Sequence, residues 1–166
     1  SPGSKTPAVF KNQTGVIYAD NFYFKIFDYT WLAGSPQTAL KDPFQVVLTE
    51  SRARSYFASL KAGDIIGREI LYDDTVKATI AGVVKDFEKP TDFIFKEFIS
   101  RATLESTNLK RHWNWEEWGS IKSSSQMFVI LNPGTTPARV EGQLVSLREK
   151  YREQNKERSE KDDTRH

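Results

Sequence analysis

Short apolar runs alternate with polar turns along much of the chain. Residues 16–19 and 45–48 are apolar and have the length of strands. Residues 76–86 alternate between apolar and polar positions and follow a polar turn at residues 73–75, which predicts a hairpin with residues 68–72. Because the alternation extends over so many residues, it indicates an antiparallel sheet with one face in water.

Two other segments have the spacing of helices. Between Thr49, a suitable cap, and Gly63, a suitable end, the apolar residues fall on one helical face at Ala53, Tyr56, Phe57 and Leu60. A second helix is predicted from Pro137, with Thr136 as its cap. Its apolar stripe consists of Val140, Leu144, Leu147 and Tyr151, and we expect this stripe to lie across a sheet. Residues 126–131 are predicted as a further strand.

This order of elements predicts an α+β fold with a mixed or antiparallel sheet and two or three packed helices. Residues 1–14 are expected to be a flexible N-terminal segment, and residues 15–151 the folded domain. Residues 152–166 are almost entirely charged or polar, so we expect them to form a disordered tail.

Composition excludes several classes of function. The chain has 24 Lys plus Arg and 22 Asp plus Glu, and a net charge of +2 gives no field suited to a nucleic-acid backbone. It has no cysteine, which excludes thiol nucleophiles and cysteine-ligated zinc. Phosphate-binding and dinucleotide-binding glycine motifs are absent from the sequence, and no apolar run is long enough to cross a bilayer. We therefore expect no cofactor, metal site or catalytic residue.

A tryptophan cluster is the most conspicuous candidate for a contact site. Trp113, Trp115 and Trp118 fall within six residues and could form a sugar-stacking, partner-binding or membrane-interface surface. Alternatively, one or two of them fill the space between parts of the fold. Within the same segment, His112 and Glu116 have the i, i+4 spacing of metal ligands, but a zinc site needs three or four ligands and no second cluster accompanies them.

Adjacent carboxylates are the other candidates for chemistry. They occur at Glu116-Glu117, Asp73-Asp74 and Asp162-Asp163. An acid/base pair in a glycan hydrolase needs a defined separation across a site, which adjacent residues do not establish. We interpret these pairs as solvated turn or surface residues.

An ordered series of short motifs extends over residues 15–151. It includes Asn21-Phe22, Leu32-Ala33-Gly34, residues 46–51, Ile66-Gly67 and residues 80–86. This series resembles the MacB-like periplasmic core domain of FtsX-like ABC transporter permeases, in the form common in Bacteroidetes. The chain departs from the family at Lys89-Pro90-Thr91-Asp92, where an Asn-Ser-His group is often found. The resemblance implies an outer lobe plus part of a membrane-proximal lobe.

The resemblance also implies a function without catalysis. Such a domain lies on the periplasmic side of the bacterial inner membrane and would pass ATP-driven movement of the membrane helices to a periplasmic partner or cargo, for export or envelope remodelling. Its implied partners are the other permease subunit, the cytoplasmic ATPase, and a periplasmic adaptor, lipoprotein or hydrolase. The alternative hypothesis is a carbohydrate- or peptide-binding module that uses Trp113, Trp115 and Trp118.

Overall fold

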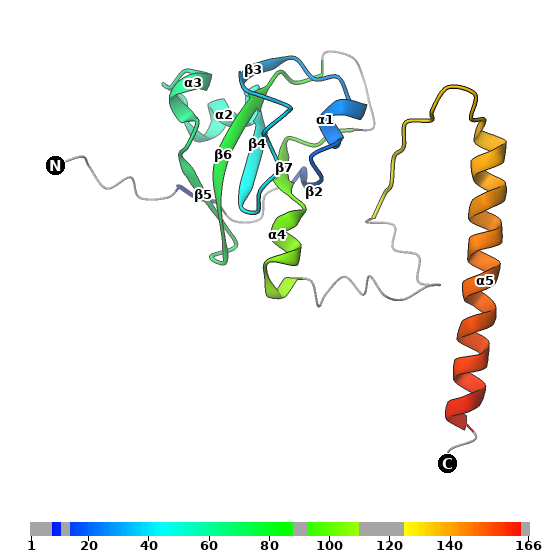
Figure 1. Ribbon diagram of the computed structural model, residues 1–166. Helices are drawn as coiled ribbons and strands as arrows, with labels where there is room; N and C mark the ends of the chain where they lie inside the picture. The colour runs from blue at the N-terminus through cyan, green and yellow to red at the C-terminus, as the bar shows by residue number, and fades with distance from the viewer. Residues whose placement is uncertain (1–7, 11–13, 88–92, 110–124, 164–166) are drawn as a thin grey trace. The chain divides into compact units, whose positions relative to one another are not determined.

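The computed structural model describes residues 8–10, 14–87, 93–109 and 125–163, and its chain divides into two compact units, residues 1–112 and 113–166 (Figure 1). The folded domain that the sequence predicts over residues 15–151 therefore spans both units. Among the described residues, no helix combines the length and the apolar character needed to cross a membrane.

The first unit is built on one mixed sheet, as the sequence predicts. Among the described residues the sheet has seven strands, in the order β1-β5-β6-β4-β7-β2, and β3 also pairs with β6. The strands are β1 (Ala8–Phe10), β2 (Val16–Ala19), β3 (Trp31–Gly34), β4 (Gln45–Thr49), β5 (Glu69–Tyr72), β6 (Val76–Val84) and β7 (Glu97–Ser100). The helices of this unit are α1 (Tyr23–Ile26), α2 (Glu50–Tyr56), α3 (Ala62–Ile65) and α4 (Ala102–Glu105).

Parallel and antiparallel pairs are combined in the sheet. The predicted hairpin is present, since β5 and β6 pair antiparallel from Glu69 opposite Thr79 to Tyr72 opposite Val76. In its turn, Asp73 and Asp74 have φ angles of 46° and 56°, a left-handed conformation that Asp tolerates better than most residues. However, β4 runs parallel to β6, β2 parallel to β7, and β1 parallel to β5. These distant pairings leave no local sequence pattern, so the hairpin alone could be predicted in detail.

The core of this unit occupies both faces of the sheet. Successive residues of β4 and β7 point to opposite faces, and they separate the buried side chains into two clusters. One cluster includes Val46, Leu48 and Ile99 and packs against α2 and α3, as Ala53 and Ile65 belong to it. The other contains Val47 and Phe98 and packs against aromatic residues of α1, namely Tyr23 and Phe24. The predicted water-exposed face is therefore confined to the start of β6, at Lys77 and Thr79.

Two predictions near α2 and β1 need correction. The helix predicted between Thr49 and Gly63 ends at Tyr56, because Phe57 leaves the helical region with φ −137° and ψ 52°, and a separate turn of helix, α3, follows. Residues 8–10 belong to the segment predicted to be flexible, but they form β1 and pair with β5. The parallel pairing with a distant strand orders them.

In the part of the second unit that the structure describes, there is one long helix, α5 (Pro137–Asp163). Thr136 caps it as predicted, since its Oγ1 accepts a hydrogen bond from the backbone N–H of Arg139 at 3.3 Å. The helix continues beyond Tyr151 to Asp163, so the disorder predicted from residue 152 is wrong as far as Asp163. Residues 152–163 are rich in Arg, Glu, Gln and Lys, which are good helix formers, and helical propensity here outweighs the lack of apolar residues.

One further prediction for this unit is wrong, because residues 126–131 form no strand. The apolar stripe of α5 finds no partner among the described residues of its own unit, where Leu144 is 58% exposed. The packing of this stripe across a sheet stays a prediction.

Candidate functional site

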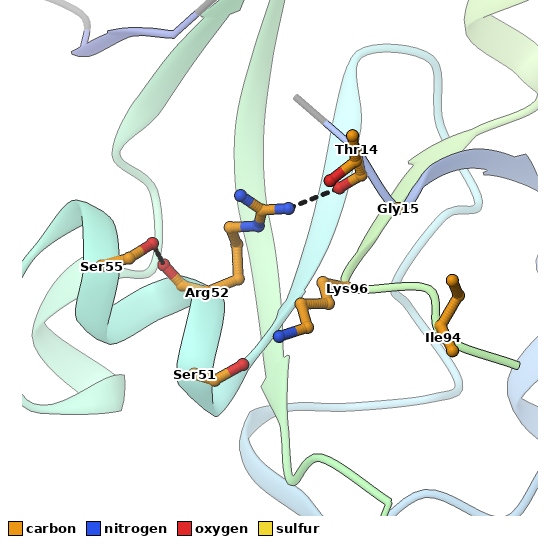
Figure 2. A pocket seen from close by; sticks show the side chains of 7 residues that line it. All are labelled: Thr14, Gly15, Ser51, Arg52, Ser55, Ile94 and Lys96. Carbon is orange, nitrogen blue, oxygen red and sulfur yellow. Dashed lines mark hydrogen bonds between the residues drawn. The ribbon is translucent and has the colours of Figure 1, made fainter. Parts of the chain in front are cut away.

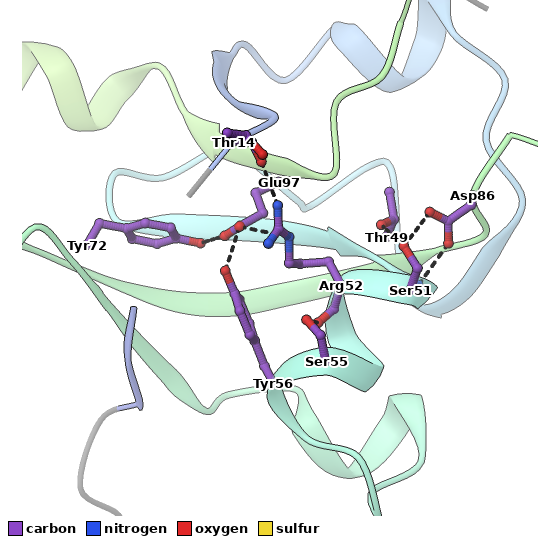
Figure 3. Close-up of polar contacts among 9 residues, drawn as sticks. All are labelled: Thr14, Thr49, Ser51, Arg52, Ser55, Tyr56, Tyr72, Asp86 and Glu97. Atoms are coloured by element: carbon purple, nitrogen blue, oxygen red, sulfur yellow. Dashed lines mark hydrogen bonds and ion pairs between the residues drawn. The ribbon is translucent and has the colours of Figure 1, made fainter. Parts of the chain in front are cut away.

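A fully buried carboxylate lies at the centre of the polar contacts of the first unit. Glu97, at the start of β7, is 0% exposed and lies on the sheet face that packs against α2. Tyr56 Oη donates a hydrogen bond to Glu97 Oε1 at 2.6 Å, and Tyr72 Oη donates one to Oε2 at 2.5 Å. Arg52 Nε forms an ion pair with Oε1 at 3.0 Å (Figure 3). Each carboxylate oxygen is thus satisfied by donors from α2 or β5, as a buried charge requires.

Arg52 connects this carboxylate to the N-terminal part of the sheet. Its side chain is only 14% exposed, and one Nη donates a hydrogen bond to the carbonyl oxygen of Thr14 at 2.5 Å. The helix α2 places Arg52 and Tyr56 four residues apart on one face, so both side chains reach Glu97, and the guanidinium lies 5.6 Å from the centre of the Tyr56 ring. The cluster of Arg52, Tyr56, Tyr72 and Glu97 is called the Glu97 cluster below.

The two tyrosines of the Glu97 cluster are held in the neutral form. Burial raises the pKa of Tyr72 far above its ordinary value of 10.0, and the negative charge of Glu97 raises it further. Burial likewise raises the pKa of Tyr56, and its hydrogen bond to Glu97 adds to the effect. Both phenols therefore remain donors to the carboxylate throughout the neutral range.

A second carboxylate is fixed at the start of α2. Asp86, just after β6, accepts hydrogen bonds from Ser51 Oγ at 2.6 Å and from the Ser51 backbone N–H at 2.8 Å. Partial burial by itself would raise the pKa of Asp86, but the hydrogen bonds from Ser51 and Thr49 and the charge of Lys96 lower it below 3.8 overall. Because Ser51 Oγ donates its proton to this carboxylate, the pair anchors α2 to the end of β6.

An open pocket of about 420 Å³ lies beside these contacts. It is lined by Thr14, Gly15, Ser51, Arg52, Ser55, Ile94 and Lys96 (Figure 2). Arg52, Ser51 and Ser55 belong to α2, whereas Lys96 immediately precedes β7. The pocket therefore combines two cations and three hydroxyl groups with one exposed apolar side chain, Ile94. Such a surface can bind a polar or anionic group.

The residues singled out in the sequence are not among the described residues that form the Glu97 cluster or line the pocket. Trp113, Trp115 and Trp118, together with His112 and the Glu116-Glu117 pair, lie outside the described residues, and their role stays a prediction. Asp73-Asp74 forms the exposed hairpin turn. Asp162-Asp163 lies in the last turn of α5. Among the described residues, no group of three or more His, Cys, Asp or Glu could hold a metal ion.

Sequence reasoning missed the Glu97 cluster. Its members come from α2, β5 and β7, and only the fold brings them together. One signal was available, because Lys96-Glu97 interrupts the apolar segment from Phe93 to Ile99. A charged residue in a strand that is buried on both faces needs buried partners.

Comparisons with known proteins agree with this fold. The family described as the MacB-like periplasmic core domain matches residues 2–147, which confirms the resemblance drawn from the motifs. A crystal structure of a domain from a protein assigned as a permease, from Porphyromonas gingivalis, has a TM-score of 0.56 and 20% identity. That match covers 81% of this chain, which spans 58% of the other.

The periplasmic region of MacB from Actinobacillus actinomycetemcomitans has a TM-score of 0.41 and 17% identity, with 54% of this chain and 39% of that chain covered. No curated protein matches the chain. The likeness to the Porphyromonas gingivalis domain confirms the predicted α+β class.

Proposed function

Because the chain belongs to the MacB-like periplasmic core domain family, we propose that it acts as a rigid extracytoplasmic body of an ABC-type permease. In this role it passes the ATP-driven movement of the membrane helices to a periplasmic partner or cargo. The family places the domain on the periplasmic side of the inner membrane. The proposal requires stiffness and no reactive group.

The observation that carries the proposal is the burial of the central strands on both faces. Val46, Val47 and Leu48 of β4 are each 0% exposed, and so are Glu97 and Phe98 of the neighbouring β7. Close-packed interiors of this kind have low compressibility and move as one body when they are displaced. A force applied to one edge of the sheet would therefore move the whole unit.

The Glu97 cluster adds polar cross-links to this packing. It ties α2 to β5 and β7, while Asp86 ties α2 to the end of β6. Hydrogen bonds to charged groups are stronger than those between neutral groups, and they are directional, which apolar contacts are not. These hydrogen bonds support the proposal because they oppose any sliding of α2 over the sheet. Apolar packing, which is not directional, does not hold α2 at one position in the same way.

The proposed partners follow from the same role. The cytoplasmic ATPase would supply the movement, a second permease subunit would complete the membrane part, and a periplasmic adaptor, lipoprotein or hydrolase would receive the movement. Since the chain spans 58% of the Porphyromonas gingivalis domain, these partners belong to the proposal for the parent protein.

Distances measured in the parent permease would test the proposal. Lys41 and Lys61 are exposed positions of the first unit, and the chain has no native cysteine, so Lys41→Cys and Lys61→Cys can be spin-labelled selectively within it. Pulsed electron paramagnetic resonance would compare the nucleotide-free and ATP-bound states in liposomes. We expect the distance between the two labels in one domain to stay the same, and the distance between the Lys61 positions of the two subunits to change.

A flexible domain would give a different result. If ATP changed the distance within one domain as much as the distance between subunits, the domain would deform and the proposal would be wrong. If neither distance changed while ATP was hydrolysed, the domain would not follow the membrane helices. A parallel measurement of ATP hydrolysis shows that the labelled permease is active.

A further inference from the structure

We propose that the pocket beside α2 binds a carboxylate side chain of a periplasmic partner, presented by an acidic peptide segment. This inference rests on the proposed function, because it describes the surface through which movement would reach the partner. The pocket has a volume of about 420 Å³, enough for one or two amino-acid side chains.

The charges around the pocket favour an incoming anion. Glu97 accepts from Tyr56, Tyr72 and Arg52, and Asp86 accepts from Ser51, so both neighbouring carboxylates are occupied by internal donors. Over the described part of the chain, the ammonium group of Lys96 has neither a hydrogen bond nor an ion pair. Its positive charge lowers the pKa of Asp86 without direct contact. Lys96 therefore offers a cation whose hydrogen-bond donors remain available to a ligand.

The geometry favours a carboxylate over a phosphate. A bound phosphate is commonly held by several backbone N–H groups that point at one position. Here the N–H of Lys96 donates to the Gly15 carbonyl oxygen at 2.8 Å, and the N–H of Ser51 donates to Asp86 at 2.8 Å. The hydroxyl groups of Ser51 and Ser55 are occupied as well, since they donate to Asp86 and to the Arg52 carbonyl oxygen (Figure 2). Lys96 Nζ therefore provides the polar contact, and one ammonium group can pair with one carboxylate.

An apolar neighbour favours a peptide over a free small acid. Ile94 lines the same pocket and is 71% exposed, so its apolar surface is available to a ligand that also reaches Lys96. A peptide with an apolar residue next to an acidic one would cover Ile94 while its carboxylate reaches Lys96. A free acid such as acetate would leave Ile94 in water and would gain only the ionic contact.

Nuclear magnetic resonance of the ¹⁵N-labelled chain would test the inference. The probe is a blocked tetrapeptide of alternating glutamate and leucine, and its control has glutamine in place of glutamate. We expect the acidic peptide, and not the control, to shift the amide signals of Ser51, Arg52, Ser55 and Lys96. Lys96→Glu should weaken the binding at least about ten-fold, because it places like charges together. Lys41→Glu, the same change at an exposed site outside the pocket, should alter it less than about two-fold.

Three outcomes would overturn the inference. They are equal shifts from the two peptides, equal effects of the two charge reversals, and shifts at the pocket from inorganic phosphate or acetate with none from the acidic peptide. None of these would affect the proposed function, because the distance measurements in the parent permease do not depend on Lys96. Conversely, a domain that deformed with ATP while still binding the peptide would overturn the proposed function alone.

Discussion

Glu97→Gln should destabilise the first unit far more than its small change in shape suggests. The substitution keeps the size of the side chain but removes its charge and replaces one acceptor oxygen with an NH₂ donor. That donor would face a phenol or the guanidinium, both of which are donors to the native carboxylate. Arg52, only 14% exposed, would lose its buried counter-ion.

The expected magnitude follows from burial. Removing one partner of a buried ion pair costs about 3–5 kcal/mol, because it leaves an uncompensated charge in the interior. Domains are stable by about 5–15 kcal/mol, so the loss would be a large fraction of the total. With a dependence of about 2 kcal/mol per molar urea, the midpoint of unfolding should fall by roughly 2 M.

Urea denaturation followed by Trp31 fluorescence would measure the effect. Trp31 packs against Phe24 in the first unit, with ring centroids 5.0 Å apart. Replacing Trp113, Trp115 and Trp118 with Phe in every variant leaves Trp31 as the sole tryptophan of the chain. The matched control is Glu50→Gln, which removes an ion pair with Arg54 on the outside of α2 and should cost less than about 1 kcal/mol.

The comparison of Glu97→Gln with Glu50→Gln tests whether the buried ion pair has the expected effect on stability. A loss below about 1 kcal/mol for Glu97→Gln, equal to that of the control, would mean that the carboxylate is not held as described. Tyr72→Phe provides an intermediate step, since it removes one hydrogen bond to a charged group and should cost about 1.5–3 kcal/mol.

Three other predictions concern the same unit. Gly82→Ala should lower the free energy of unfolding, measured by urea denaturation, by about 1–3 kcal/mol, because the added Cβ would overlap the Trp31 ring. In the control Gly63→Ala, in α3, the added Cβ meets no atom within 4 Å, so this change should be neutral or stabilising. Asp86→Asn should lower the stability at neutral pH, and the difference from the native chain should shrink as the pH falls below 3.8. The reason is that a lowered pKa gives stability that is lost on protonation, and denaturation at several pH values would show whether the two curves converge. Since the pKa of Tyr72 is raised, its contribution should be full below pH 10.0 and decline above it. The chain has six tyrosines, so the Tyr72 phenolate is measured as the difference in absorbance between the native chain and Tyr72→Phe. A difference that rose before unfolding would contradict this.

Local patterns carried most of what could be predicted. The hairpin of β5 and β6 and the cap of α5 each depend on residues close together in sequence, and both are present. The pairings of β4 with β7 and of β2 with β7 join residues that are distant in sequence, so no local pattern predicts them. The Glu97 cluster was missed for the same reason, because Arg52, Tyr72 and Glu97 are far apart in sequence.

Two predictions are wrong because each infers structure from apolar content alone. Residues 126–131 have the composition of a strand, but a strand forms only where a neighbour completes its hydrogen bonds. Conversely, the lack of apolar residues after Tyr151 predicts disorder, but this segment is helical as far as Asp163 because Arg, Glu, Gln and Lys favour helix on their own.

The parallel pairing of β2 with β7 has a consequence for how the protein is made. Val16 lies opposite Glu97, so a strand synthesised early acquires its neighbour only after almost the whole first unit has emerged. Contacts between such distant residues slow folding, because the loop between them must close first. A chain delivered across a membrane in N-to-C order would therefore present unpaired strand edges during its passage, and protection from aggregation would be needed until β7 arrives.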